Sequence, residues 1–384
     1  MPYNILFYSM SSHFEWRLGV TNRNRQLVEC WQRDPRVGKI LMVDFLPYSF
    51  RRAAREVWKA RIWEKDPNTR HMGWGFKLNQ ESEKLYVYSG VHPLGIAQCV
   101  KKLDFGEDFI SLSSNPMDTG FLIQGKGRVF DAVDDWRAHP AYAKYTKRLD
   151  KNYAEIAQKS DLIFTVSDSL RKVFTPHKQV HWIPNGVDLD HFGRTDIFVE
   201  NFELDSSSSK IPHPIAGYVG QIQDRVDLDL VAKAAGELPQ VSFVFIGKVW
   251  DTIANEVEDK FKNITNVHFL GPKDYSVLPK YIQAFDIGLI PHKINDLTRS
   301  MNPLKLYEYL AAGKRVLTTP VEGVKISPEF VIVAKDAAEF ISQIKRILAK
   351  PVDSIRVQSS VQPHSWSARV DQIFGHIDKI LRVG

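Results

Sequence analysis

The segment 302–313 combines a charged pair with the start of a predicted helix. Pro303 stands near the beginning of the helical stretch, and Gly313 ends it before a buried strand. Lys305 and Glu308 are three residues apart, which places both side chains on one face of the helix. Backbone N–H groups at a helix N-terminus attract anions, and Lys305 adds a positive charge. The segment predicts a diphosphate site with Glu308 accepting from ribose hydroxyls; the alternative is an ordinary Lys–Glu pair on a surface helix.

A group of carboxylates follows the predicted strand 128–130. Asp131, Asp134 and Asp135 lie within five residues, at the carboxyl end of a strand, where open α/β sheets bind ligands. Carboxylates this close repel one another, which raises the pKa of at least one of them. We predict that Asp134 or Asp135 is a general base that takes a proton from an attacking hydroxyl. The alternative is that these aspartates only cap the next helix.

His13 is a second candidate for the base. It lies in the polar loop that follows the first predicted strand, 5–8. An imidazole has an unperturbed pKa of about 6.5, which suits proton transfer near neutral pH. The alternative is a loop histidine with no part in catalysis.

Two Asp-Leu-Asp triplets, 188–190 and 227–229, have the spacing of an Asp-x-Asp metal motif. One stands beside the Asn185-Gly186 pair, where we expect a tight turn with a positive backbone φ. The other begins a predicted helix, where acidic residues suit the helix dipole. We therefore predict no catalytic metal.

Short apolar runs alternate with amphipathic stretches along both halves of the chain. The amphipathic stretches that we expect to form helices are 23–33, 145–159, 228–237, 337–349 and 366–381. This alternation predicts parallel sheets covered by helices on both faces, in two doubly wound α/β domains. The polar run 201–210, with four consecutive serines, indicates a linker. We place the domains at 1–200 and 201–365, followed by a C-terminal helix at 366–384.

Length and composition support this organisation. The 384 residues exceed one small domain, and 43% hydrophobic with 25% charged residues exclude a disordered or fibrous chain. Cys30 and Cys99 are too few for a disulfide scaffold, which favours a reducing compartment. The first residues lack the pattern of a signal peptide, and no apolar run is long enough to span a membrane. We expect a cytoplasmic protein.

The positive charge is concentrated in the first half. Residues 1–180 hold 28 basic and 20 acidic side chains. The segment 51–63 is basic, helical in period and contains Trp58 and Trp63, a pattern typical of a helix on an anionic bilayer. The alternative is a solvated basic face with both tryptophans packed inward. No aromatic–basic motif for nucleic acid is present, so we predict no nucleic-acid partner.

Several segments together carry a resemblance to a known family. In order and spacing they are similar to the nucleotide-sugar glycosyltransferases of the GT-B fold, along the whole chain. The chain is most similar to the bacterial envelope and exopolysaccharide branch, which includes teichuronic acid and xanthan-type transferases. Pro303, Lys305 and Glu308 here replace the commoner Glu-x7-Glu pattern, and Ser300 stands in place of its first glutamate. The segments are 183–188 with Phe192, 217–220, 245–247 and 303–313.

The resemblance implies two Rossmann-like domains that face a central cleft. The first would bind the acceptor and the second the donor, with the helix 366–384 packing back on the first. Glu308 would bind the ribose, while Lys305 and nearby amides would hold the diphosphate. Arg225 would reach the diphosphate or remain a solvated loop residue. The other residues expected at the donor are Asn302, Pro303, Leu304 and Gly220, with Asn295 and Thr298, in the loop 291–301, as sugar partners.

The function that we expect is transfer of a sugar from a nucleoside diphosphate sugar, with a UDP-sugar favoured, to a hydroxyl of a glycan or lipid-linked saccharide. The enzyme would be a metal-independent hexosyltransferase, with the donor as co-substrate and no other cofactor. It would act in polysaccharide, exopolysaccharide or cell-envelope biosynthesis, as a peripheral protein on the inner face of the plasma membrane. A base at Asp134 or Asp135 implies inversion, but a retaining route stays open. The alternatives are a sugar-nucleotide 2-epimerase and a catalytically silent binding partner in a biosynthetic complex.

Overall fold

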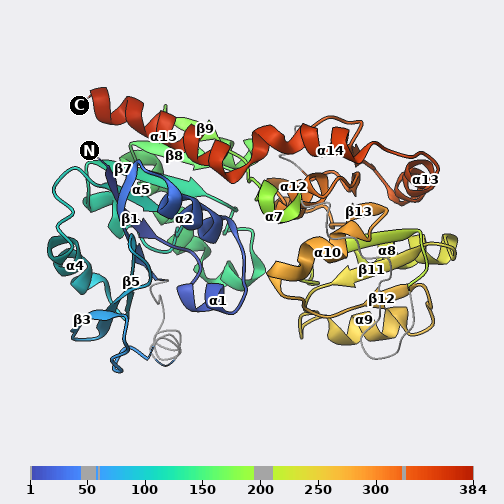
Figure 1. Cartoon of the computed structure of the whole chain (residues 1–384), viewed down its shortest axis with the longest axis horizontal. Helices are drawn as coiled ribbons and strands as arrows, with labels where there is room; N and C mark the ends of the chain where they lie inside the picture. Colours follow the sequence, from blue (N-terminus) through green and yellow to red (C-terminus); the bar gives the residue numbers. More distant parts are fainter. Residues whose placement is uncertain (1, 45–57, 59–60, 194–210, 322–325, 384) are drawn as a thin grey trace. The chain divides into compact units, whose positions relative to one another are not determined.

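The chain divides into two compact units. The computed structural model describes residues 2–44, 58, 61–193, 211–321 and 326–383 (Figure 1). The first unit comprises Met1–Pro184 and Arg369–Gly384, and the second comprises Asn185–Ala368. The division falls earlier than the boundary expected at residue 200, because Asn185 is hydrogen-bonded within the second unit to Asn302. The serine-rich run 201–210 lies outside the described residues.

In the described part of the first unit, nine strands form one sheet. Their order is β3-β4-β5-β2-β1-β6-β7-β8-β9. All pair in parallel except the hairpin β3–β4, which adds antiparallel strands beside β5. The doubly wound expectation is confirmed, with this hairpin as an addition. The strands are β1 (Tyr3–Tyr8), β2 (Val37–Val43), β3 (Thr69–Gly73), β4 (Phe76–Gln80), β5 (Leu85–Gly90), β6 (Ile110–Ser113), β7 (Gly127–Ala132), β8 (Leu162–Thr165) and β9 (Val180–Trp182).

The strand β4 has one apolar and one polar face. Phe76 and Leu78 are buried in the hydrophobic core of the unit. Lys77 and Asn79 alternate with them, and alternate residues of a strand point to opposite faces. The sheet thus presents a polar surface at this position, opposite the core.

The helices of the first unit follow the predicted amphipathic stretches. The helix expected over 23–33 is confirmed, and that over 145–159 begins at Thr146. Asn22 caps α2 by accepting from the backbone N–H of Arg25, at 3.1 Å. On α5, Leu149 and Ile156 are fully buried on the face that covers the sheet. The helices are α1 (His13–Arg17), α2 (Arg23–Arg33), α4 (Ile96–Lys102), α5 (Thr146–Lys159) and α6 (Asp168–Val173).

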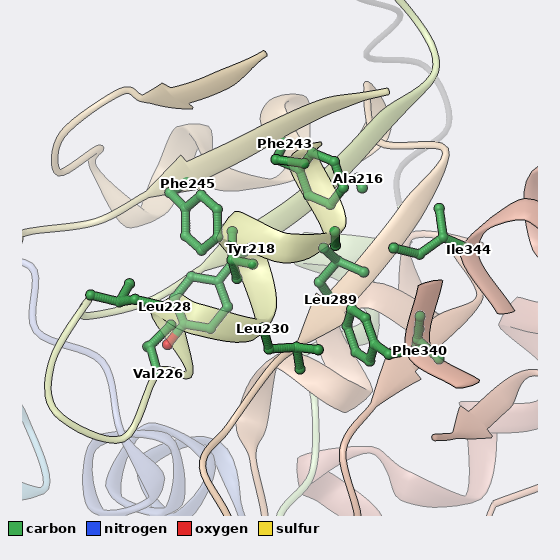
Figure 2. Packing of buried hydrophobic residues seen from close by; sticks show 14 of the residues in the cluster. Ala216, Tyr218, Val226, Leu228, Leu230, Phe243, Phe245, Leu289, Phe340 and Ile344 are labelled. Carbon is green, nitrogen blue, oxygen red and sulfur yellow. The ribbon is translucent and has the colours of Figure 1, made fainter. Parts of the chain in front are cut away.

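The described part of the second unit holds a six-stranded parallel sheet. Its order is β12-β11-β10-β13-β14-β15, which confirms the second doubly wound domain. Figure 2 shows its core, where Tyr218 and Phe245 from neighbouring strands lie near each other and Phe340 points toward Leu289. The strands are β10 (Ile215–Val219), β11 (Ser242–Ile246), β12 (Val267–Phe269), β13 (Ile287–Ile290), β14 (Val316–Thr318) and β15 (Val331–Val333).

Helices connect these strands. The helices predicted over 228–237 and 337–349 appear as α8 and α13. The set is α7 (Leu189–Phe192), α8 (Leu228–Glu237), α9 (Ala254–Phe261), α10 (Leu278–Gln283), α11 (Asp296–Ser300), α12 (Leu304–Ala311), α13 (Ala337–Leu348) and α14 (Ser354–Val361).

The C-terminal helix α15 (Trp366–Val383) begins in the second unit, and from Arg369 onward it groups with the first. Phe374 stacks on Tyr3 with ring centroids 5.5 Å apart. Asp371 accepts from the Arg36 guanidinium at 2.6 Å. Figure 1 shows the helix beside β8 and β9.

Most of the basic segment 51–63 lies outside the described residues. Trp58 and Trp63 are described, and their exposed fractions of 75% and 54% contradict the alternative in which both pack inward. No helix in the described parts of the chain is long and apolar enough to cross a membrane.

Candidate functional site

The helix α12 forms where the sequence predicts it. Pro303 is its N-cap residue and provides no side-chain cap. The helix ends at Ala311, and Gly313 follows with φ +73°, the left-handed conformation expected of a C′ glycine. Its first turn therefore presents backbone N–H groups together with the side chain of Lys305.

Lys305 is buried against the carboxyl end of β10. Its Nζ lies 4.8 Å from the centre of the Tyr218 ring. Gly220, just after β10, has φ +136°, and a Cβ there would lie 3.2 and 3.3 Å from Cε and Nζ of Lys305. Because Gly220 has no Cβ, it leaves space for the side chain of Lys305.

The charged groups of Lys305 and Glu308 are shielded from water by burial. Burial, with a smaller contribution from Arg225, lowers the pKa of Lys305 to about 7. Burial raises the pKa of Glu308 to about 7, and Lys305 opposes that rise. Within the described segments, neither side chain has a hydrogen-bond or ion-pair partner. The ammonium group therefore lacks a counter-ion that an anionic ligand would supply.

Arg225 and His292 complete the surroundings of Lys305. Nη1 of Arg225 lies 3.9 Å from Sδ of Met301. His292 is 1% exposed, and neither ring nitrogen has a hydrogen-bond partner. Burial holds the pKa of His292 well below its usual range, and Lys305 and Arg225 lower it further. His292 was not predicted, because nothing in its neighbourhood along the chain marks a buried histidine.

Asn295 and Thr298 form part of a helix rather than a loop. The segment 291–301 was expected to be a loop, but it contains α11. Oδ1 of Asn295 accepts from the backbone N–H of Thr298, and Oγ1 of Thr298 accepts from that of Asn295, both at 3.0 Å. This reciprocal cap uses the side-chain oxygens that we expected to meet a sugar.

Asn302 links α12 to the segment 183–188. Its Oδ1 accepts from the backbone N–H of Asn185 at 2.7 Å, and its Nδ2 donates to the Tyr307 hydroxyl at 3.0 Å. We expected a positive φ at Gly186, and this expectation is wrong, because Gly186 is not among the glycines with a positive φ. A Cβ at Gly186 would lie 2.9 Å from the carbonyl oxygen of His364, so the glycine permits close packing of two segments.

Two of the three carboxylates at the end of β7 and just after it form ion pairs with arginines. Asp131 accepts from Nε and Nη2 of buried Arg23, at 2.7 and 2.9 Å. Asp135 forms a two-bond ion pair with Arg137, at 2.8 and 2.7 Å. Asp131 and Asp135 thus each have an arginine partner, which offsets the repulsion expected among these carboxylates. Asp134 is half-buried, and its carbonyl oxygen accepts from a tyrosine hydroxyl.

His13 is the first residue of α1, close to the carboxyl end of β1. Its backbone N–H donates to Oδ1 of Asp44 at 3.0 Å. Burial lowers the pKa of its imidazole, although Glu81 opposes the change. His13 lines a cavity of about 300 Å³ in the first unit.

The two Asp-Leu-Asp triplets are helix caps. Asp188 accepts from the backbone N–H of His191 at the start of α7, and Asp227 does the same for Leu230 at the start of α8. Over the described residues, no group of three or more metal-ligating side chains gathers in one place. Both triplets therefore have a structural explanation.

Comparison with known proteins gives consistent matches. Residues 213–350 match the family described as glycosyl transferases group 1. A putative teichuronic acid biosynthesis glycosyltransferase, TuaH of Bacillus subtilis (strain 168), is 25% identical over 241 residues. That match covers 59% of this chain and 59% of TuaH.

Solved structures match along the whole chain. Sucrose-phosphate synthase from Thermosynechococcus elongatus has a TM-score of 0.72 at 16% identity, with 100% of both chains covered. Anabaena HepE in complex with UDP has a TM-score of 0.65 at 13% identity, covering 98% of this chain and 100% of HepE. These structures share the fold, which confirms the expected GT-B architecture.

Proposed function

We propose that the chain, whose residues 213–350 match the group 1 glycosyl transferases and whose fold is GT-B, transfers a hexosyl group from a UDP-sugar to a saccharide hydroxyl. TuaH is named for teichuronic acid biosynthesis, which supports a role in polysaccharide or cell-envelope biosynthesis. The complex of HepE with UDP supports this nucleotide as the donor carrier. A catalytic metal is not part of the proposal.

The observation that carries the donor site is the buried, unpaired Lys305 at the start of α12. A diphosphate would supply the missing negative charge and accept from the first N–H groups of the helix. Glu308, one turn further along, would accept from the ribose hydroxyls. Arg225 would add a second cation, since its charge already acts on Lys305.

In the transfer, the acceptor oxygen forms a bond to the anomeric carbon while the bond from that carbon to the diphosphate oxygen breaks. The hydroxyl proton passes to a base, for which Asp134, Asp135 and His13 are the candidates. The leaving diphosphate gains negative charge, and Lys305 with the α12 amides would stabilise it. A single displacement of this kind inverts the anomeric centre.

The acceptor would be a glycan or lipid-linked saccharide bound by the first unit. Exposed Trp58 and Trp63 support contact with a membrane surface, because tryptophan favours the membrane–water interface. The excess of basic residues in the first half would favour anionic lipids. We therefore place the enzyme on the cytoplasmic face of the plasma membrane.

Calorimetric titration with UDP, GDP and dTDP tests the donor site. We expect UDP to bind, with affinity lowered at least about tenfold in Lys305→Met and in Glu308→Gln, since each loses a charge-assisted contact. Lys248→Met removes an exposed lysine of the same unit and should leave affinity unchanged. Binding of none of the three nucleotides by the folded protein would contradict the proposal. Conversion of free UDP-N-acetylglucosamine without acceptor would indicate an epimerase instead.

A further inference from the structure

We propose that the cavity beside His13 binds the acceptor through one neutral, hydroxyl-rich sugar unit. The inference rests on the proposed function, which requires an acceptor but leaves its chemistry open. The bound unit is an uncharged sugar rather than an anionic or cationic one.

The cavity lies on the polar face of β4 and β5. Lys77, Asn79 and Glu81 alternate along one segment, and Val87 and Ser89 lie on the paired strand. Alternate residues share a face, and on the opposite face Phe76 and Leu78 pack in the core. The cavity is therefore built on rigid paired strands, with α1 contributing His13.

Among the described residues that line the cavity, the charges balance. Its described lining residues include four basic and four acidic side chains. Lys77 pairs with Asp66 at 3.0 Å, and Arg61 pairs with Glu64 at 3.3 Å. An anionic or cationic ligand would have to compete with these internal pairs, whereas a neutral polar ligand would not.

The remaining polar groups match a sugar. Asp44 accepts from the backbone N–H of His13 and from the Ser89 hydroxyl, at 3.0 and 3.3 Å. Side chains that donate and side chains that accept thus lie together, and each sugar hydroxyl can do both. Except for Phe14 and Val87, the described lining is polar. A volume of about 300 Å³ is at the lower end of the ~300–1,000 Å³ typical of ligand pockets, which suits a single sugar ring.

The cavity also favours His13 among the three candidate bases. His13 is one of the described residues that line the cavity, whereas Asp134 and Asp135 are not among them, and Asp135 is already paired with Arg137. Burial lowers the pKa of the imidazole, which favours the neutral form that accepts the proton of a sugar hydroxyl.

Saturation-transfer NMR on the full chain tests the cavity without relying on catalysis. The probes are methyl β-D-glucopyranoside, methyl β-D-galactopyranoside and methyl β-D-glucuronide. We expect a neutral glycoside to bind, and Ser89→Ala to raise its Kd about tenfold by loss of one hydrogen bond. Ser359→Ala, at an exposed serine of the second unit, is the control and should leave Kd unchanged.

Three outcomes would overturn the inference: no bound glycoside, an unchanged Kd in Ser89→Ala, or tighter binding of the glucuronide than of both neutral glycosides. UDP binding is measured in the same samples, and its absence would count against the proposed function alone. His13→Gln should lower kcat for transfer at least about a hundredfold. A wild-type kcat in this variant would overturn the assignment of the base.

Discussion

Replacing Lys305 with methionine should stabilise the ligand-free protein while weakening donor binding. The pKa of Lys305 falls from 10.5 to about 7, and at ~1.4 kcal/mol per pH unit the buried charge costs about 5 kcal/mol of folding free energy at pH 7. The contact with Tyr218 offsets ~1–2 kcal/mol of that cost. Lys305 also favours the charged form of Glu308, and this benefit disappears in the variant. We expect a net gain of about 1–3 kcal/mol in the free energy of unfolding.

The effect has a defined pH dependence. The pKa of Lys305 is lowered only in the folded state. Below pH 7 the lysine is charged in both states, so the folded protein bears the full free-energy cost of the buried charge. Between pH 7 and 10.5 the folded lysine is neutral while the unfolded one is still charged, so the wild type becomes more stable as pH rises. The advantage of Lys305→Met should therefore be greatest at or below pH 7 and shrink toward pH 10.

Urea unfolding at pH 6, 7 and 9, with UDP titration of the same samples, measures both effects. Lys248→Met, at an exposed lysine, should change neither stability nor affinity. A variant Lys305→Met less stable than the wild type at pH 7, or an advantage that grows with pH, would refute the argument from burial. An unchanged affinity for UDP would refute the assignment of Lys305 to the diphosphate.

Three other substitutions test the packing and the charges. Arg23→Met should cost ~3–5 kcal/mol by leaving buried Asp131 without its cation. Chemical denaturation of Arg23→Met, Asp131→Asn and the double variant gives the coupling energy of the pair, and additive effects would contradict the coupling. Gly186→Ala should cost ~1–3 kcal/mol, measured by the same method, because its Cβ would meet a backbone oxygen at 2.9 Å. The pKa of Glu308 rises from 4.5 to about 7 in the folded state. Glu308→Gln should therefore be more stable than the wild type above pH 7 and lose that advantage toward pH 4.5. An advantage that is largest at low pH would contradict the direction of this pKa shift.

The elements that depend on local pattern were predictable from the sequence. The bounds of α2 and α8 agree with the predicted stretches, because their apolar residues recur with the helical period. The hairpin β3–β4 was not predicted. Its first strand, Thr69–Gly73, has no apolar run, and it is a strand only because β4 pairs with it.

The candidate donor site likewise has a part that was predictable from local sequence and a part that was not. The spacing of Lys305 and Glu308 on one helix turn is a local property and was correctly placed on α12. The groups around Lys305 come from other elements, and Tyr218, Gly220 and His292 reach it only through the order of strands β10 and β13. No short motif records that neighbourhood.

The aspartates at the end of β7 and just after it show most clearly why the sequence alone was not sufficient. From the sequence alone, Asp131, Asp134 and Asp135 are neighbours whose charges repel. In the structure, Asp131 is neutralised by Arg23, which is 108 residues away along the chain. The sequence by itself determined the elements, the two α/β domains and the position of the charged helix, because periodicity and spacing are local. Only the tertiary structure decided which charges are paired and which stay available for chemistry, because burial and counter-ions come from residues distant in the chain.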